Sequence, residues 1–219
     1  MKTHFNIPLR IATIAFGFSW VAASGQVVEA DETALRSVGA KKAVVLLDIY
    51  WARVWRCGRY ENAQLRSLSF ERAPLSQSAE NATPSLVFES PSRLSPLKNF
   101  TPYAVVVEPG EYHLTGFQVG FARSVSNVGE TLVTRSESIV DSRSKFGSFT
   151  VSAGEFVYIG NFAVDCYKDP IPWRYYTQGK KDFTNHLSQY KAKYPALPVE
   201  SVVYRLFSTS ALGEAYELK

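Results

Sequence analysis

The stretch GSFTVSAGEFVYIGNF, residues Gly147 to Phe162, places β-branched and aromatic residues on both sides of a glycine-centred turn. This pattern predicts a strand, a turn and a second strand. The stretch VEPGEYHLTGF from Val107 and the stretch VSAGEFVYIGNF from Val151 both fit V-x-[PA]-G-E-[YF]-x-[LY]-x-G. Glycine tolerates positive φ values, and proline suits the corner of a type I or II turn. We therefore interpret both stretches as turns of the scaffold rather than as copies of a ligand site.

Strand patterns fill most of the chain around these turns. The strongest is VVLLDIYWARVWRC, residues 44–57, whose odd positions are apolar except at Arg53. A period of two places them on one face, so Trp51, Trp55 and Cys57 are expected to point inward. A hairpin bent at Pro109–Gly110 is expected over residues 103–125. Further strands are predicted at residues 64–72, 85–90, 138–141 and 200–209, with a proline-rich loop over much of residues 74–102.

One helix is predicted in DFTNHLSQYKAKYP, residues 182–195. Asp182 can cap its start and Pro195 stops it. Four side chains then share one helical face: Phe183, Leu187, Tyr190 and Tyr194. Strands followed by one helix and a last strand predict a mainly β fold, an immunoglobulin- or transthyretin-like β-sandwich with one C-terminal α-helix packed on it.

The first residues have the features of a secretory signal peptide. The first ten residues carry the basic residues Lys2 and Arg10. The apolar run IATIAFGFSWVAA follows, and the small residues ASGQ come at its end. The apolar run is short for a membrane span, which needs about 20 residues. We predict cleavage after Gly25, so that residues 1–25 are removed; cleavage after Ala23 or Ser24, or an uncleaved anchor, are the alternatives.

The remaining chain is expected to be one domain. Residues 26–43 are predicted to be a flexible lead and residues 44–219 a single β-sandwich domain. Loss of Lys2 and Arg10 removes two positive charges from a net charge of +4, and the nearly balanced remainder gives no reason to expect a nucleic-acid partner. No later apolar run is long enough to cross a bilayer, so we expect a periplasmic or secreted protein.

Cys57 and Cys166 are the two cysteines of the chain. An even count in an exported protein predicts a disulfide. It would close a loop of about 110 residues and stabilise the fold by about 4–5 kcal/mol in the chain-entropy model. A reactive thiol is the alternative interpretation.

Enzyme motifs are sparse. His113 and His186 have no metal-ligand spacing, so no metal or other cofactor is predicted. A cysteine hydrolase would need a free thiolate, with Cys166 and His186 as its candidates. The two catalytic carboxylates of a glycosidase have no fixed separation in a sequence, so spacing does not identify such a pair. The candidate carboxylates are interpreted by default as solvated groups: Glu61, Glu71, Glu111, Glu155 and Asp165.

The best predicted binding segment is DPIPWRYYTQGKK, residues 169–181. Aromatic rings beside cations suit sugar rings, peptides or anionic envelope polymers. The predicted contact residues are Trp173, Arg174, Tyr175 and Tyr176. The alternative is that these rings cover an edge of the core.

The two V-x-[PA]-G-E-[YF] turns, the strand VYIGNF and the helix ending in KYPAL resemble small exported β-sandwich proteins of Gram-negative bacteria, in domain families of unknown function. The resemblance covers about residues 103–209 and implies an exported β-sandwich without implying an activity. Together these observations lead us to expect an exported, non-catalytic envelope protein that binds a protein or glycan. An envelope-directed hydrolase or a purely structural protein are the alternatives.

Overall fold

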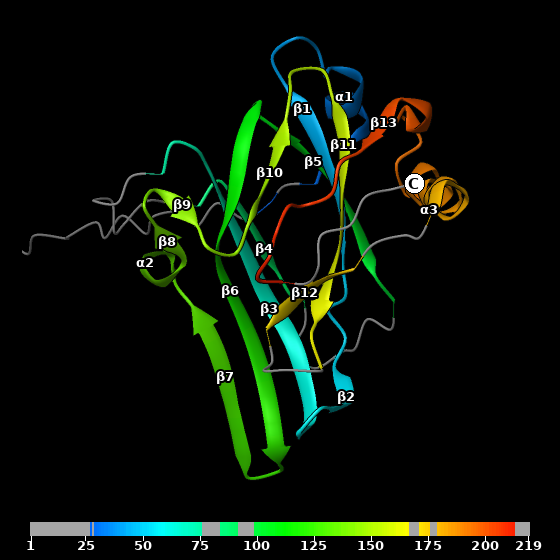
Figure 1. Cartoon of the computed structure of the whole chain (residues 1–219). Helices are drawn as coiled ribbons and strands as arrows, with labels where there is room; N and C mark the ends of the chain where they lie inside the picture. Colours follow the sequence, from blue (N-terminus) through cyan, green and yellow to red (C-terminus); the bar gives the residue numbers. More distant parts are fainter. Residues whose placement is uncertain are drawn as a thin grey trace, which may run out of the picture.

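The computed structural model describes residues 27, 29–75, 84–91, 99–166, 171–175 and 179–212, so the predicted signal peptide lies outside the described residues. The described chain is mainly β, as predicted, with two larger sheets packed face to face and helix α3 (Gly179–Lys193) on the outer side of one of them (Figure 1). No described helix has the length and apolar character needed to cross a membrane.

The five-stranded sheet lies next to α3. Its strand order is β12-β11-β1-β5, with β13 also paired to β11, and β1 runs parallel to β11 and antiparallel to β5. The bounds of its strands are β1 Ala43–Ile49, β5 Thr101–Val107, β11 Phe156–Val164, β12 Pro172–Tyr175 and β13 Val202–Tyr204.

The six-stranded sheet forms the other layer. Its strand order is β10-β6-β3-β2; β4 also pairs with β3, and β7 also pairs with β6. The bounds of its strands are β2 Val54–Cys57, β3 Tyr60–Arg72, β4 Leu86–Glu89, β6 Gly110–Ser124, β7 Asn127–Val133 and β10 Ser148–Val151. A small sheet of β8 (Ile139–Val140) and β9 (Arg143–Ser144) follows the short helix α2 (Arg135–Ser138).

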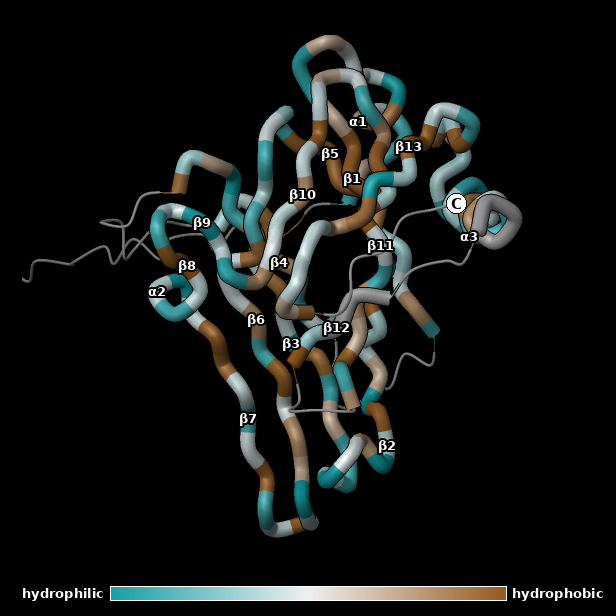
Figure 2. Tube along the Cα trace, viewed as in Figure 1, coloured by the Kyte–Doolittle hydropathy of each residue, from teal (hydrophilic) through white to brown (hydrophobic). Residues whose placement is uncertain are grey.

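Strand β1 is buried on both faces and is hydrophobic along most of its length (Figure 2). Val45, Leu47 and Ile49 join the core between the sheets, whereas Val44 and Leu46 pack in a second core towards α3. The four predicted apolar residues of α3 are buried in this second core, which confirms the predicted helical face. Helix α3 begins at Gly179, so the predicted start at Asp182 is wrong by three residues.

Both copies of the repeated motif form corners between the sheets. The chain leaves β5 of one sheet and enters β6 of the other at Gly110, which has a φ of 151°. It returns from β10 to β11 at Gly154, which has a φ of 78°. Both predicted turns are confirmed, but the predicted hairpin over residues 103–125 is wrong because β5 and β6 belong to different sheets.

Other predictions hold in part. Strands β3, β4 and β8 confirm the segments predicted at residues 64–72, 85–90 and 138–141, whereas the strand predicted at 200–209 is reduced to β13. Within residues 26–43, the predicted lead, the structure places helix α1 (Glu32–Arg36), whose Leu35 is buried against the second core.

The predicted disulfide is confirmed. Cys57 at the end of β2 is bonded to Cys166, which follows β11, so the bond joins the two sheets. Gly58 makes this approach possible, because a Cβ atom there would lie 2.6 Å from the carbonyl oxygen of Cys166. Disulfides are typical of oxidising compartments.

Candidate functional site

A concave region of about 310 Å³ lies on the outer face of the six-stranded sheet, towards the end where β2 and the β6–β7 turn lie (Figure 1). We call it the arginine–tryptophan pocket. Its lining residues include Arg53, Trp55, Glu61, Asn62, Arg66, Gly120 and Val128.

Strand register explains why the surface is hollow here. Trp55 on β2 is paired with Asn62 on β3, Asn62 with Ala122 on β6, and Ala122 with Val128 on β7. Gly120 lies two residues before Ala122 and therefore faces the same side. Gly120 and Ala122 on β6 thus give the floor small side chains, and the larger side chains of Trp55 on β2 and Val128 on β7 form the walls.

Trp55 forms one wall and is 65% exposed. The guanidinium carbon of Arg53 lies 5.5 Å from the centroid of its ring, in cation–π contact. A large exposed aromatic side chain beside a cation offers a flat apolar surface with polar groups at its edge.

Arg66 reaches across the floor from β3. A Cβ atom at Gly120 would lie 2.4 Å from its Nε and Nη2 atoms, so the guanidinium occupies the space above this glycine. Its Nη1 lies 3.8 Å from Oε2 of Glu130, which also accepts a hydrogen bond from Gln118 at 2.8 Å. The buried Nε of Arg66 makes no hydrogen bond in the described part of the chain.

Arg53, Arg66 and Glu61 are the charged residues that line this pocket, and further arginines lie at the same end of the sheet. Residues 53–66 and 118–130, which include β2, the start of β3 and the β6–β7 turn, carry five arginines and two glutamates. Two of these arginines, Arg59 and Arg123, lie over the ring of Tyr60 at 5.2 and 5.4 Å. This end of the six-stranded sheet therefore has an excess of three positive charges.

The predicted inward position of Trp55 is wrong. Arg56 has a φ of 55°, which breaks the alternation of β2, so Cys57 is buried whereas Trp55 faces outward. The residues of the pocket were not identified from the sequence, because they come from four strands whose register is set by the fold. The excess of arginines in residues 53–66 is the signal that the sequence offered.

The segment predicted to bind lies elsewhere. The backbones of Trp173, Arg174 and Tyr175 form strand β12, an addition to the five-stranded sheet beside β11. Their side chains, and all of Tyr176, lie outside what the structure describes. The segment remains a second predicted binding surface.

The candidates for a cysteine hydrolase are engaged in other interactions. Cys166 is bonded to Cys57, so the thiolate that this mechanism requires is not present. His186 on α3 lies with its Nε2 2.9 Å from Oδ2 of the buried Asp48 on β1. Tyr190 donates a hydrogen bond to the same oxygen at 2.7 Å. Burial, and then the negative charge of Asp48, raise the pKa of Tyr190 well above its usual range. This cluster fixes α3 to the five-stranded sheet.

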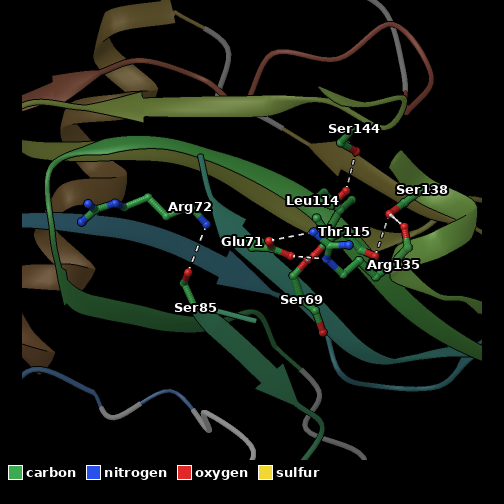
Figure 3. Close-up of polar contacts among 9 residues, drawn as sticks. All are labelled: Ser69, Glu71, Arg72, Ser85, Leu114, Thr115, Arg135, Ser138 and Ser144. Carbon is green, nitrogen blue, oxygen red and sulfur yellow. Dashed lines mark hydrogen bonds and ion pairs between the residues drawn. The ribbon is translucent and has the colours of Figure 1, made fainter. Parts of the chain in front are cut away.

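Helix α2 and β9 are fixed to the six-stranded sheet at a different position on it (Figure 3). Arg135 donates two hydrogen bonds to the carboxylate of Glu71, at 2.7 and 3.1 Å. Ser138 is buried and donates to the carbonyl oxygen of Thr115 at 2.8 Å. These polar contacts hold a surface segment in place.

Three of the scattered carboxylates have structural partners. Glu71 pairs with Arg135, Glu155 pairs with Arg205, and Glu111 accepts a hydrogen bond from Ser148. The default interpretation as solvated groups is wrong for Glu71 and for Asp165, because both are buried.

Among the described residues, no three His, Cys, Asp or Glu side chains are grouped closely enough to hold a metal ion. His113 is buried on β6, with its Nε2 3.6 Å from Glu111.

Fold and site together define a mainly β protein with a disulfide between its two packed sheets and a cationic, aromatic pocket on one outer face. Comparisons with protein-family models, with curated proteins and with solved structures found no match to this chain.

Proposed function

We propose that this chain is an exported, non-catalytic binding module of the bacterial cell envelope, and that it binds a glycan in the arginine–tryptophan pocket. The immunoglobulin- or transthyretin-like assignment of the packed sheets and the periplasmic or secreted location are parts of the same proposal. The disulfide supports an oxidising location.

The observation that carries the proposal is the exposed indole of Trp55 at the wall of a concave, polar pocket. The faces of a sugar ring present C–H groups that pack on an aromatic ring, and its hydroxyl groups need planar polar partners around that ring. The carboxamide of Asn62 and the guanidinium groups of Arg53 and Arg66 line the same pocket and are groups of this kind.

A glycan array tests the proposal. The purified exported protein should bind a subset of the immobilised glycans, and Trp55→Ala should lose that binding without a change in circular dichroism. The double variant Trp173→Ala, Tyr176→Ala is the matched control, because it removes two rings from the other predicted surface.

The outcomes distinguish the sites. Unchanged binding by Trp55→Ala with loss in the double variant would move the site to the segment at β12. An absence of glycan binding by the wild-type protein would reject the glycan proposal and leave a protein partner or a purely structural role.

A further inference from the structure

We propose that the ligand of the arginine–tryptophan pocket is an acidic saccharide whose carboxylate is bound by the guanidinium group of Arg66. This inference rests on the proposed function and specifies the chemical class of its ligand. It is carried by the position of Arg66, by the state of its donors and by the charge around the pocket.

Arg66 lies at the floor of the pocket and is partly buried. Its side chain is 28% exposed, and its guanidinium lies over Gly120 at the floor, where any other residue would place a Cβ atom. Gly120 therefore has a role in recognition, because it leaves room for the arginine.

In the described part of the chain, the donors of Arg66 are not saturated by protein acceptors. A guanidinium group has five N–H donors. The carboxylate of Glu130 lies 3.8 Å from Nη1, beyond a charge-assisted hydrogen bond of about 2.7–2.9 Å, and it already accepts from Gln118. An anionic ligand oxygen would be a stronger acceptor for these donors than water.

The surroundings favour an anion over a neutral sugar. Two arginines, Arg53 and Arg66, and one glutamate, Glu61, line the pocket, so its lining has an excess of one positive charge that favours a negative ligand. Trp55 and Arg53 form the wall beside Arg66, and the exposed ring favours a sugar ring over a small free anion. A saccharide with a carboxylate combines both features.

The test compares acids with their own methyl esters. Oligosaccharides that contain glucuronate, galacturonate or sialate are each paired with the methyl ester, which removes the charge and keeps the ring. Binding to the purified exported protein is measured by titration calorimetry at low and at high salt. At least one acid should bind about 10- to 100-fold more tightly than its ester, and this preference should weaken at high salt.

Three variants assign the effect to Arg66. Arg66→Gln should remove the preference for the acid and leave the affinity for the ester within about twofold of the wild-type value. Arg66→Lys keeps the charge without the planar fork and should restore part of the preference. Arg143→Gln removes the same charge from the exposed strand β9 and should bind as the wild type does.

The failures of the two proposals are distinguishable. Equal binding of every acid and ester would overturn the acidic-saccharide inference and leave a neutral-glycan pocket. Absence of binding to all probes would overturn the inference as well, and the glycan array would then decide the proposed function separately. A preference that persists in Arg66→Gln would contradict the assignment to Arg66.

Discussion

The guanidinium group of Arg66 occupies the space that a side chain at Gly120 would fill. A Cβ atom at position 120 would lie 2.4 Å from Nε of this arginine. The two residues come from adjacent strands, β3 and β6. A glycine in the middle of a strand weakens the strand, so a glycine that admits another side chain has a structural reason to be there.

The first prediction concerns this contact. Gly120→Leu should fill the floor of the pocket, displace the guanidinium group of Arg66 and lower glycan affinity about tenfold or more. Gly120 is buried beneath Arg66, so the same variant should also lower the free energy of unfolding, by about 1–3 kcal/mol. Affinity is measured by calorimetry and stability by urea unfolding.

The control for this variant is Val140→Leu, which enlarges an exposed side chain on β8. It should bind as the wild type does. Full binding by Gly120→Leu would contradict the assignment of the site to this pocket.

The second prediction concerns acid stability. Hydrogen bonds from Arg205, and then from the backbone N–H of Ser152, lower the pKa of Glu155 from 4.5 to about 2. The ionised carboxylate is therefore favoured in the folded state, and its contribution is present above pH 4.5 and is lost as the pH falls towards 2. Since Arg205 is 40% exposed, solvent screening reduces this contribution to about 1 kcal/mol.

Glu155→Gln should flatten the loss of stability between pH 4.5 and pH 2, measured by urea unfolding at a series of pH values. Glu200→Gln changes an exposed carboxylate and should lose stability in acid as the wild type does. Parallel curves for the wild type and Glu155→Gln would show that this pair has no such role.

Local patterns were sufficient to predict many elements of this fold. Alternation identified the strands around residues 64–72 and 85–90, and a helical period identified the buried face of α3. The cysteine count predicted the disulfide. The strands and the helical face depend on residues that are close in the sequence, and the disulfide depends on the number of cysteines.

Sheet membership and the pocket could not be predicted in this way. A corner between sheets uses the same Pro-Gly turn as a hairpin, so Pro109–Gly110 did not reveal where β6 would pair. The pocket needs Trp55, Gly120 and Val128 in register across four strands, and one positive φ at Arg56 decides which way Trp55 faces.

The third prediction concerns the attachment of α3. Asp48→Ala should lower the free energy of unfolding by about 2–4 kcal/mol, because it removes the acceptor of Tyr190 and the partner of His186 inside the protein. Tyr190→Phe removes one hydrogen bond and should cost about 1 kcal/mol. Urea unfolding followed by circular dichroism measures both variants.

Ser188→Ala is the control on α3, since this serine is exposed. It should be neutral. An Asp48→Ala protein as stable as the Ser188→Ala protein would mean that apolar packing alone holds the helix.

The fourth prediction concerns the disulfide. Replacing Cys57 and Cys166 with serine should lower the free energy of unfolding by about 2–5 kcal/mol. The wild type should show a matching fall in melting temperature when reductant is added, and its cysteines should resist alkylation until then. Rapid alkylation of the unreduced exported protein would reject the bond and reopen the thiol interpretation.

Glycan binding in the arginine–tryptophan pocket is tested most directly by titrating the ¹⁵N-labelled protein with its bound glycan, followed by NMR. The indole N–H signal of Trp55 is assigned with the variant Trp55→Phe. If the glycan binds in the arginine–tryptophan pocket, this signal and the amide signal of Gly120 should shift together and saturably, with little change in α3. Saturable shifts at β12 or α3, with Trp55 and Gly120 unmoved, would contradict binding in this pocket.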